Sequence, residues 1–398
     1  MLRFTKKTLL LFAVLALVAA ACGSSSDDTT TTAAGPAATT TTTAPTTTTT
    51  AAPGDTTTTT APLPLTPVKT CLVTDLAGVD DRSFNASAWQ GVLEAVAGLA
   101  ATTDSFVLES DAVEDWQPNI DSMLSQNCEH IVAVGFALGE VTELNARANT
   151  DVLWTLVDVD LFDFAAGEDI TLDNLREVVF QTDEAAFLAG YLAAGVSETG
   201  VMGTYGGAPF PTVSIFMDGF ARGAAHYNEV KGTDVSVIGW RVDDQDGTFT
   251  GSFTDMGVAR STADSLFDEN VDMIIPVGGA INLPAGDAIT ERGLDAALIG
   301  VDVDAFFAAP EQYQDLWLTS VLKNITKAVQ DSVVAHAQGV WTNGLTCGNL
   351  ANNGVGLSDF HSWDSRVSAE LAGEVAALAE DIKSGAVDAS FTFVADVC

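Results

Sequence analysis

Residues 73–85, VTDLAGVDDRSFN, decide the fold, because they predict a strand that runs through a polar, glycine-containing turn into a helix. The strand is expected at Cys71–Thr74. The helix follows from apolar residues that recur every three or four positions from Phe84 onward, with Asp81 or Ser83 as its N-cap. Open α/β sheets bind ligands where a strand enters a helix through such a loop, since backbone N–H groups point outward there. The stretch therefore predicts an α/β protein with a ligand site beside this turn.

Three side chains beside the turn have the chemistry to hold a small, flat, polar molecule. The ring of Phe84 can stack on such a molecule, while Asn85 and Asp75 can form hydrogen bonds with it. A purely structural interpretation exists as well, in which Phe84 packs the helix onto the core and Asp75 caps the turn. The motif alone leaves both interpretations open.

The first 22 residues have the features of a secretory signal. Basic residues precede an apolar run from Thr8 to Ala21, which is shorter than the roughly 20 residues that a membrane span needs. Cys22 directly follows three alanines and resembles the cysteine of a bacterial lipobox, although Ala19 stands where leucine is commonest. We therefore expect residues 1–22 to be a lipoprotein signal peptide with a diacylated Cys22. The alternative is an ordinary signal peptide with an unrelated cysteine.

Residues 23–68 have the composition of a disordered tether. Ser, Thr, Ala and Pro dominate this segment, and no large apolar residue occurs before Leu63. Nothing is therefore available to offset the conformational entropy of ordering the chain. We expect an extended, solvated spacer that holds a folded domain away from the membrane.

Residues 69–398 have the composition of a large globular protein, and this length favours two domains or lobes. The whole chain carries 16 basic and 54 acidic residues, which gives a net charge of −38. Such a charge argues against a nucleic acid partner and against electrostatic adhesion to anionic lipid. No stretch after residue 69 is long and apolar enough for a transmembrane helix.

Four cysteines remain after Cys22, and an even number in an exported protein suggests disulfides. Three pairings are possible. Cys71 opens the first predicted strand and Cys128 precedes the third, and in a sheet of order 2-1-3 these strands are parallel neighbours about 5 Å apart. That geometry favours Cys71–Cys128 and leaves Cys347–Cys398. A metal site is not expected, since no C-x-x-C spacing occurs and the four histidines are scattered.

Apolar, β-branched segments alternate with amphipathic helices along the rest of the chain, which predicts parallel sheets covered on both faces. The remaining strands are expected at Ser105–Glu109, His130–Val134, Val152–Val157, Val178–Phe180, Val201–Tyr205, Val235–Trp240, Met273–Val277, Leu298–Val301 and Leu316–Leu322. The helices are expected near Pro118–Gln126, Glu140–Asn149, Glu184–Gly195, Val213–Tyr227, Asp255–Phe267, Pro284–Arg292, Ile325–Gly339 and Ser368–Lys383.

There are too many strands for one sheet with a single switch point. We therefore predict two similar lobes: lobe one at about 69–180 plus part of 303–340, and lobe two at about 181–302 plus part of the C-terminal tail. Polar and glycine residues follow the strands of both lobes, and together they are expected to line a cleft between them. These strand-end residues are Asp75, Gly135-Phe136, Asp158, Gly206-Gly207, Gly278-Gly279 and Asp302.

Several motifs, in order and over nearly all of 69–398, resemble one known family. They are VTDLAGVDDRSFNASAW (73–89), VAVGF (132–136), FQTDEAAFLAG (180–190), GSFTD (251–255), IGVDVD (299–304), LTSVLK (318–323) and GVGLSDFHSW (354–363), together with Leu156–Asp158 and Val277–Gly279. The chain resembles the basic membrane protein family of ABC-transporter substrate-binding lipoproteins, in particular its purine-nucleoside receptors. That resemblance implies the type I periplasmic-binding-protein fold, in which two doubly wound α/β lobes are joined by a crossover hinge and close over a ligand.

The resemblance also implies roles for individual residues. Phe84 and Phe253 would stack on the two faces of a purine. Asp158 and Asn85, with Asp75 nearby, would address the base, and the ribose hydroxyls would be held by Gly279, Asp302 and Lys323. This chain departs from the family's pattern after Gly279. The family usually continues with small and glycine residues there, whereas this chain has Ala280–Pro284. The ribose contacts are the part of the prediction that this departure affects.

The implied protein is a monomer, lipid-anchored on the extracytoplasmic face of the cell membrane, that passes purine nucleosides to an ABC permease and its ATPase. No cofactor, metal or catalytic residue is expected. A receptor of the same fold for another small polar solute, such as a sugar or a signal, is the first alternative. A nucleoside hydrolase-like enzyme is the second, because Asp80-Asp81 after Gly78 is similar to the acidic metal-binding loop of those enzymes. That loop needs carboxylates where this chain has Thr74 and Leu76, so a metal would lack ligands.

Overall fold

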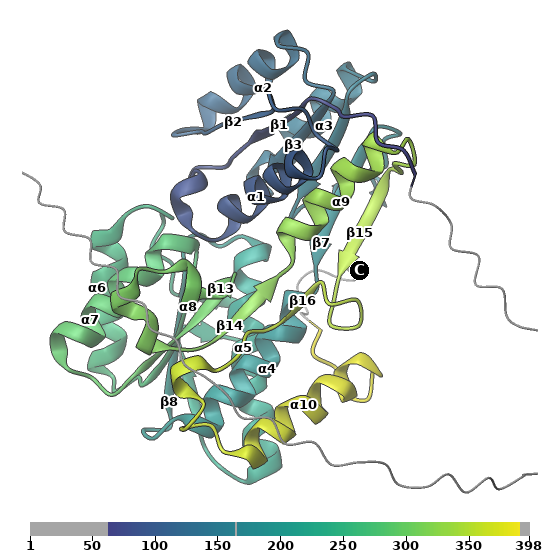
Figure 1. The fold of residues 1–398 in the computed structure, drawn as a ribbon. Helices are drawn as coiled ribbons and strands as arrows, with labels where there is room; N and C mark the ends of the chain where they lie inside the picture. Colours follow the sequence, from purple (N-terminus) through teal and green to yellow (C-terminus); the bar gives the residue numbers. More distant parts are fainter. Residues whose placement is uncertain (1–62, 164, 391–398) are drawn as a thin grey trace, which may run out of the picture. The chain divides into compact units, whose positions relative to one another are not determined.

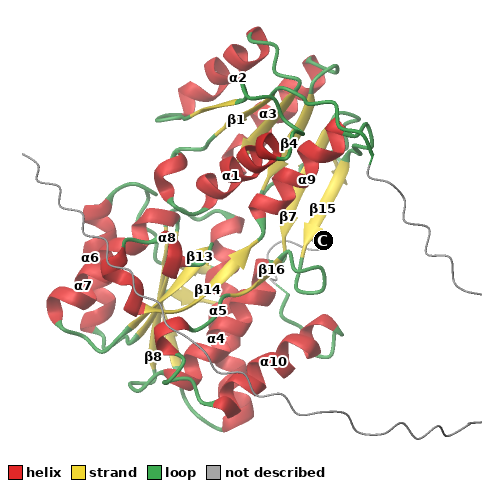
Figure 2. Ribbon diagram, viewed as in Figure 1, coloured by secondary structure: helices red, strands yellow, loops and turns green. Residues whose placement is uncertain are grey.

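The computed structural model describes residues 63–163 and 165–390, and it contains two six-stranded sheets flanked by helices (Figure 1; Figure 2). The first sheet consists of β1 (Thr70–Val73), β2 (Phe106–Leu108), β3 (His130–Val134), β4 (Leu153–Val157), β7 (Leu175–Phe180) and β15 (Gly344–Gly348). The helices that accompany it are α1 (Phe84–Ala97), α2 (Trp116–Ser125), α3 (Gly139–Ala148) and α9 (Ile325–Ala337).

The second sheet repeats this architecture. Its strands are β8 (Val201–Gly206), β9 (Ser236–Ile238), β12 (Met273–Val277), β13 (Ala297–Asp302), β14 (Trp317–Lys323) and β16 (Val355–Leu357). Its helices are α4 (Thr182–Val196), α5 (Pro211–Lys231), α6 (Met256–Asp268), α7 (Leu283–Arg292), α8 (Ala305–Ala308) and α10 (Ala369–Lys383). Two small ribbons, β5–β6 (Phe162–Asp163 with Glu168–Asp169) and β10–β11 (Trp240–Arg241 with Asp246–Gly247), lie in loops.

Strand order confirms the predicted doubly wound topology. The first sheet runs β2-β1-β3-β4-β7-β15 with every pair parallel, so the predicted 2-1-3 order is correct. The second runs β9-β8-β12-β13-β14-β16, with only β16 antiparallel to its neighbour. Each sheet therefore reverses its winding direction at one point, between β1 and β3 and between β8 and β12. Ligand crevices of open α/β sheets form at such points.

The buried faces of both sheets explain why the strands are continuous apolar runs. All five residues of β3 are buried, as parallel strands covered on both faces require. Alternate residues of these strands belong to different apolar clusters: Leu72 and Val132 join a cluster that extends into both sheets, whereas Cys71 and Ile131 join a cluster on the opposite face. No helix in the described part of the chain combines the length and apolar character that a membrane crossing demands.

The tail crosses between the lobes more than once. Strand β14 lies in the second sheet, α9 packs on α1 of the first lobe, β15 joins the first sheet, and β16 and α10 return to the second lobe (Figure 1). Strand β15 thus lies beyond the limit of 340 that the sequence predicted for the first lobe. Neither β15 nor β16 was predicted as a strand. Their sequences, GLTCG and VGL, are short, glycine-rich and only partly buried, so they lack the apolar run that marks the other strands.

One predicted strand is broken in two. The segment predicted at Val235–Trp240 divides into β9 and β10 at Gly239, which has φ 94°. A Cβ atom at this position would lie 1.9 Å from the carbonyl oxygen of Thr204, so only glycine allows the backbone of β8 to approach here.

The disulfide Cys71–Cys128 is present, as the strand order predicted, with its Cα atoms 6.0 Å apart. It joins the start of β1 to the residue that precedes β3 by two positions, inside the apolar cluster of that face. Cys398 lies outside the described residues, so the pairing Cys347–Cys398 stays a prediction. Cys22, the signal peptide and most of the tether also lie outside the described residues.

We expect non-reducing peptide mapping of the full chain to show Cys71–Cys128 and Cys347–Cys398. The double variant Cys71→Ala/Cys128→Ala should lower the free energy of unfolding by about 2–5 kcal/mol, toward the low end because a large core supplies most of the stability. Denaturant unfolding of both proteins measures the difference. Four free thiols, or a Cys71–Cys398 link, would contradict the pairing.

Candidate functional site

The predicted strand-end residues of the two sheets line one cavity, except for Gly206-Gly207, which do not line it. It is bounded by the carboxyl ends of β1, β3 and β4 in the first sheet and of β8, β12 and β13 in the second. The structure brings all eight predicted ligand-binding residues to this cavity: Asp75, Phe84, Asn85, Asp158, Phe253, Gly279, Asp302 and Lys323. The strand-end rule selected three of these residues independently of any resemblance, namely Asp75, Asp158 and Asp302. The cavity therefore lies where the carboxyl ends of both sheets converge.

The buried ammonium group of Lys323 belongs to the cavity wall. Lys323 is the last residue of β14, and its side chain is only 2% exposed. Its Nζ donates a hydrogen bond to Oδ2 of Asp158 and lies 4.0 Å from Oδ1 of Asp302. Because β14 belongs to the second sheet and Asp158 follows β4 of the first, this ion pair joins the two lobes.

Three aromatic rings surround the same ammonium group. The Nζ of Lys323 lies 5.4 Å from the ring centre of Phe84, 5.5 Å from that of Phe180 and 5.3 Å from that of Phe216. These distances are within the range of cation–π attraction, which is stronger in a desolvated site. The rings replace part of the hydration that the charge loses on burial.

The two aspartates beside Lys323 share an uncommon backbone conformation. Asp158 has φ 63° and Asp302 has φ 66°, both in the left-handed region. Aspartate is one of the few residues with a side chain that is enriched in this region. Each aspartate stands where its strand ends, so the conformation turns the chain away from the sheet at the wall of the cavity.

Burial raises the pKa values of the carboxyl groups around the cavity. Burial raises the pKa of Asp75 to about 6, against the hydrogen bonds from Asn85 and Ala77 that lower it. Burial likewise raises the pKa of Asp302 to about 6, although Lys323 and the hydroxyl of Ser83 oppose the shift. The pKa of Asp158 is raised because burial outweighs its ion pair with Lys323. The protein therefore compensates the ionised carboxylates only in part, and hydrogen-bond donors from a ligand would stabilise them.

Asp81 organises the turn that opens helix α1. Its two carboxylate oxygens accept hydrogen bonds from the backbone N–H groups of Ser83, Asn85 and Ala86, at 2.8–3.0 Å, and from the side-chain amide of Asn85 at 3.1 Å. Of the two predicted N-cap residues, Ser83 occupies the N-cap position, but Asp81 supplies the capping carboxylate. Both oxygens of Asp81 are thus used inside the protein, although the residue lines the cavity.

Aromatic side chains form a row along another wall. The rings of Phe210 and Phe253 stack with their centres 6.0 Å apart and an interplanar angle of 28°. Phe136 of the first lobe lies 5.6 Å from Phe210 of the second, ring centre to ring centre. Phe253 lies against Gly207, where a Cβ atom would come within 2.3 Å of the ring. Glycine at the end of β8 thus allows the Phe253 ring to reach the cavity.

A second polar contact crosses between the lobes at Ser83, which is 3% exposed. Its hydroxyl group lies 2.7 Å from Oδ2 of Asp302 and 3.1 Å from the carbonyl oxygen of Val301. The N-terminus of α1 in the first lobe is therefore held against the end of β13 in the second. The Ser83–Asp302 and Phe136–Phe210 contacts together show that the two lobes meet around the cavity.

Sequence reasoning left out several residues of the cavity wall: Asp81 as a wall residue, Thr212, Val213 and the rings of Phe210 and Phe216. The strand-end rule named Phe136 as a cleft residue but assigned it no contact. Phe210 follows β8 at the N-cap of α5, so the same rule could have found it. Phe216 lies within α5, where its apolar side chain is indistinguishable in the sequence from a core residue.

Comparison with known proteins gives a consistent family. The family model described as "ABC transporter substrate-binding protein PnrA-like" matches residues 68–384. Basic membrane protein A of Borreliella burgdorferi is 27% identical over 316 residues, which cover 79% of this chain and 85% of that protein. A protein of Lactococcus lactis named "ABC transporter nucleoside-binding protein BmpA" is 27% identical over 308 residues, covering 73% of this chain and 82% of that protein.

Solved structures show the same fold. An ABC transporter system solute-binding protein from Aeropyrum pernix superimposes with a TM-score of 0.72 at 22% sequence identity, covering 83% of this chain and 95% of that one. Together with the two doubly wound sheets and their crossovers, this likeness confirms the predicted type I periplasmic-binding-protein fold.

Replacing the buried ammonium group should destabilise the whole protein. Lys323→Met keeps most of the side-chain volume but leaves Asp158 and Asp302 without their counter-charge, and such losses typically cost about 3–5 kcal/mol. Both carboxyl groups have raised pKa values, so they accept protons as the pH falls and the penalty shrinks. The loss should therefore be larger at about pH 8 than at about pH 5, in thermal or denaturant unfolding.

The double variant Lys323→Met/Asp158→Asn is the matched test of the cause. It removes a buried charge of each sign, so it should recover part of the stability lost in the single variant. A single variant as stable as the wild type at both pH values would show that the ion pair does not hold the lobes together.

Proposed function

Because the chain belongs to the family of PnrA-like ABC transporter substrate-binding proteins, we propose that it binds purine nucleosides in the cavity between its lobes. The observation that carries this proposal is the convergence of aromatic rings, carboxylates and one ammonium group on a single cavity at the carboxyl ends of both sheets. The relative from Lactococcus lactis, named as nucleoside-binding, supports the choice of ligand.

A nucleoside has two parts, and the cavity offers chemistry suited to each. The half-buried rings of Phe84 and Phe253 come from different lobes and provide faces on which a purine can stack. Asp302 has one oxygen engaged by Ser83, and its other oxygen lies 4.0 Å from Lys323, where it can accept hydrogen bonds from ribose hydroxyls. Asp302, Lys323 and Gly279 thus form the proposed ribose end, and Asn85 and Asp75 the proposed base end.

The position of Asp158 modifies the assignment made from the resemblance. Asp158 was predicted to address the base with Asn85, but its Oδ2 accepts from Lys323, which also neighbours Asp302. We propose that Asp158 acts mainly by holding the Lys323 ammonium group in place, and that the base is addressed by Asp75 and Asn85, which hydrogen-bond each other.

The alternatives have less support. A receptor of the same fold for a sugar would use the carboxylates, but it would leave the rings of Phe84, Phe210 and Phe253 with only the apolar face of a sugar to cover. For a metal-dependent enzyme, the described residues gather no set of three or more His, Cys, Asp or Glu side chains able to hold a metal ion. We therefore propose a binding protein without catalysis.

The family implies a partner and a location. We propose that the protein is a monomer that delivers its ligand to an ABC permease and ATPase from the extracytoplasmic face of the membrane. The net charge of −38 makes a nucleic acid partner unfavourable. Attachment to the membrane is proposed to come from acyl chains on Cys22.

Stacking and ribose recognition should be separable by mutation. Phe84→Ala should weaken the binding of nucleosides and of free bases alike by about tenfold or more, since stacking on one ring contributes about 1–3 kcal/mol. Asp302→Ala should weaken nucleosides more than free bases, because only nucleosides carry the ribose. Isothermal titration of ligand-free protein with adenosine, guanosine, inosine, guanine and guanosine monophosphate measures both effects. The monophosphate should bind far more weakly than guanosine, because the carboxylates of the cavity repel its phosphate.

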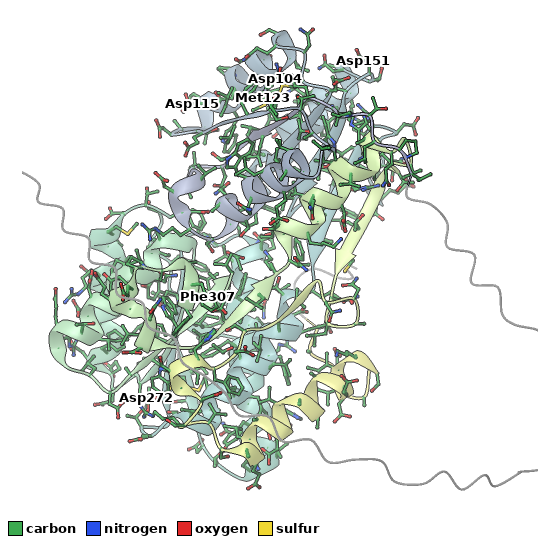
Figure 3. All side chains as sticks on the ribbon, in the orientation of Figure 1. Asp104, Asp115, Met123, Asp151, Asp272 and Phe307 are labelled. Carbon is green, nitrogen blue, oxygen red and sulfur yellow. A yellow bond between two sulfur atoms is a disulfide. The ribbon has the colours of Figure 1, made fainter. Side chains whose placement is uncertain are left out.

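Matched controls exist for both variants. Phe307 is 73% exposed and Asp151 is exposed, and neither lines the cavity, so Phe307→Ala and Asp151→Ala should bind like the wild type (Figure 3). A wild type that binds a free sugar but no nucleoside would replace the proposed ligand with the first alternative.

Anchoring through Cys22 is tested by fractionation. Two acyl chains hold a protein stably on a membrane where one is marginal, so Cys22→Ser should move the protein from the membrane to the soluble fraction. Ser24→Ala, two residues further along, should leave it in the membrane. Retention of the Cys22→Ser variant on membranes in detergent-free fractionation would show that lipid on Cys22 is not the anchor.

A further inference from the structure

The base end of the cavity contains two hydrogen-bond acceptors without a protein donor. Oδ1 of Asn85 is buried and has no hydrogen-bond partner among the described residues. Oδ1 of Asp75 accepts from the backbone N–H of Ala77 and from the amide of Asn85, while within the described residues Oδ2 of Asp75 accepts from no group. Buried acceptors are almost always satisfied in native proteins, so the buried Oδ1 of Asn85 indicates a donor that comes from outside the chain. Asp75 is half-buried and lines the cavity, so its Oδ2 can accept a second donor from the same ligand.

The orientation of the Asn85 amide is fixed by its neighbours. Its Nδ2 donates to Oδ1 of Asp75 at 2.8 Å and to Oδ2 of Asp81 at 3.1 Å, so both amide hydrogens are used. A flipped amide would place its carbonyl oxygen against two carboxylate oxygens. Asn85 can therefore offer a ligand only its carbonyl oxygen, although an asparagine in general can donate or accept.

Asp81 adds no further acceptor for a ligand, because its two oxygens already accept hydrogen bonds from four N–H groups of the protein. The base end thus presents one amide oxygen and one carboxylate oxygen, on two side chains joined by a 2.8 Å hydrogen bond. The Asp75–Asn85 pair thus offers a ligand two acceptors and no side-chain donor.

We propose that the Asp75–Asn85 pair selects nucleosides whose base edge carries two adjacent N–H donors, which makes guanosine the preferred ligand over inosine and adenosine. This inference rests on the proposed function, since it ranks ligands of that site. Guanine carries N1–H beside the 2-amino group. Hypoxanthine has N1–H alone, and adenine has an acceptor at N1, which would face the acceptors of the protein.

The expected ranking follows from unpaired acceptors. A site built to receive donors rejects an analogue that lacks them, because its buried polar atoms are then left unpaired. Losing one hydrogen bond to a carboxylate or a buried amide should weaken inosine about tenfold relative to guanosine. Adenosine has a repulsive lone pair in place of the N1–H donor and can offer only its 6-amino group on the other side of N1, so we expect about 100-fold weaker binding.

Asp75→Asn is the sharpest test, because the structure fixes which way the new amide points. The N–H of Ala77 and the amide of Asn85 both donate to Oδ1, so the carbonyl oxygen of the new asparagine stays there. Its NH₂ group then takes the place of Oδ2 and offers a donor to the ligand. Guanosine should weaken by about tenfold or more and adenosine should gain, so the guanosine-to-adenosine affinity ratio should fall by about 100-fold.

The measurement is isothermal titration of ligand-free, detergent-solubilised full chain with guanosine, inosine and adenosine. Asp80→Asn is the matched control, because Asp80 is exposed, lies five residues away and does not line the cavity. It should keep the wild-type ratio. A ratio of two affinities on one preparation does not depend on how much of that preparation is folded.

The outcomes distinguish a failure of this inference about base selectivity from a failure of the proposed function. A wild type that binds all three nucleosides within about threefold overturns the inference and leaves the proposed function standing. So does an Asp75→Asn variant that keeps the wild-type ratio. A wild type that binds no nucleoside overturns the proposed function itself.

Discussion

The arrangement of the two lobes depends on the ion pair between the buried ammonium group of Lys323 and the carboxylate of Asp158. Taking an ammonium group and two carboxylates out of water costs several kcal/mol per ion, and the cost is offset only if partners of opposite charge and suitable polarity surround them. Here the lysine comes from β14 of the second sheet, while Asp158 follows β4 of the first. Neither lobe alone contains this set of charges. This set of charges therefore exists only where the lobes meet. Strand β14, which ends at Lys323, contributes both to the cavity and to the connection between the lobes.

The two lobes have the same backbone conformation at one strand end, but the aspartate side chains there make different contacts. Val157-Asp158-Val159-Asp160 spans the end of β4, and Val301-Asp302-Val303-Asp304 spans the end of β13, at matching positions of the two sheets. Both central aspartates have φ near 65°, yet Asp158 bonds Lys323 and Asp302 bonds Ser83. Similar strand ends thus bring carboxylates to one cavity from opposite sides. The cavity is nevertheless asymmetric because each lobe adds a different element, namely the Asp81 turn in the first and the strand β14 with Lys323 in the second.

The sequence predicted the sheets and the position of the cavity between them, because both follow from local patterns. Continuous apolar strands between amphipathic helices indicate parallel sheets, and strand ends such as Asp75 and Asp302 mark the edge where ligands bind. The strands β15 and β16 were missed, since their pairing depends on the distant strands β7 and β14 rather than on their own residues. Phe253 and Lys323 came only from the family resemblance. No local pattern marks a lysine inside a strand as a buried cation, because its partners lie 165 and 21 residues away.

The carboxylate of Asp302 takes part both in a contact between the lobes and in the wall of the cavity. Ser83 lies against Oδ2 of Asp302 across the cleft, while Oδ1 remains beside Lys323 and faces a ligand. Asp302 is buried where the lobes meet, and burial raises its pKa to about 6, so its ionised form has an electrostatic cost in this arrangement. A ligand that donates hydrogen bonds to this carboxylate would remove part of that cost. A ligand shifts a conformational equilibrium only through a difference in affinity between two states, so such donors would favour this arrangement of the lobes over one in which Asp302 meets water. A polar solute without donors at the right positions would give no such preference.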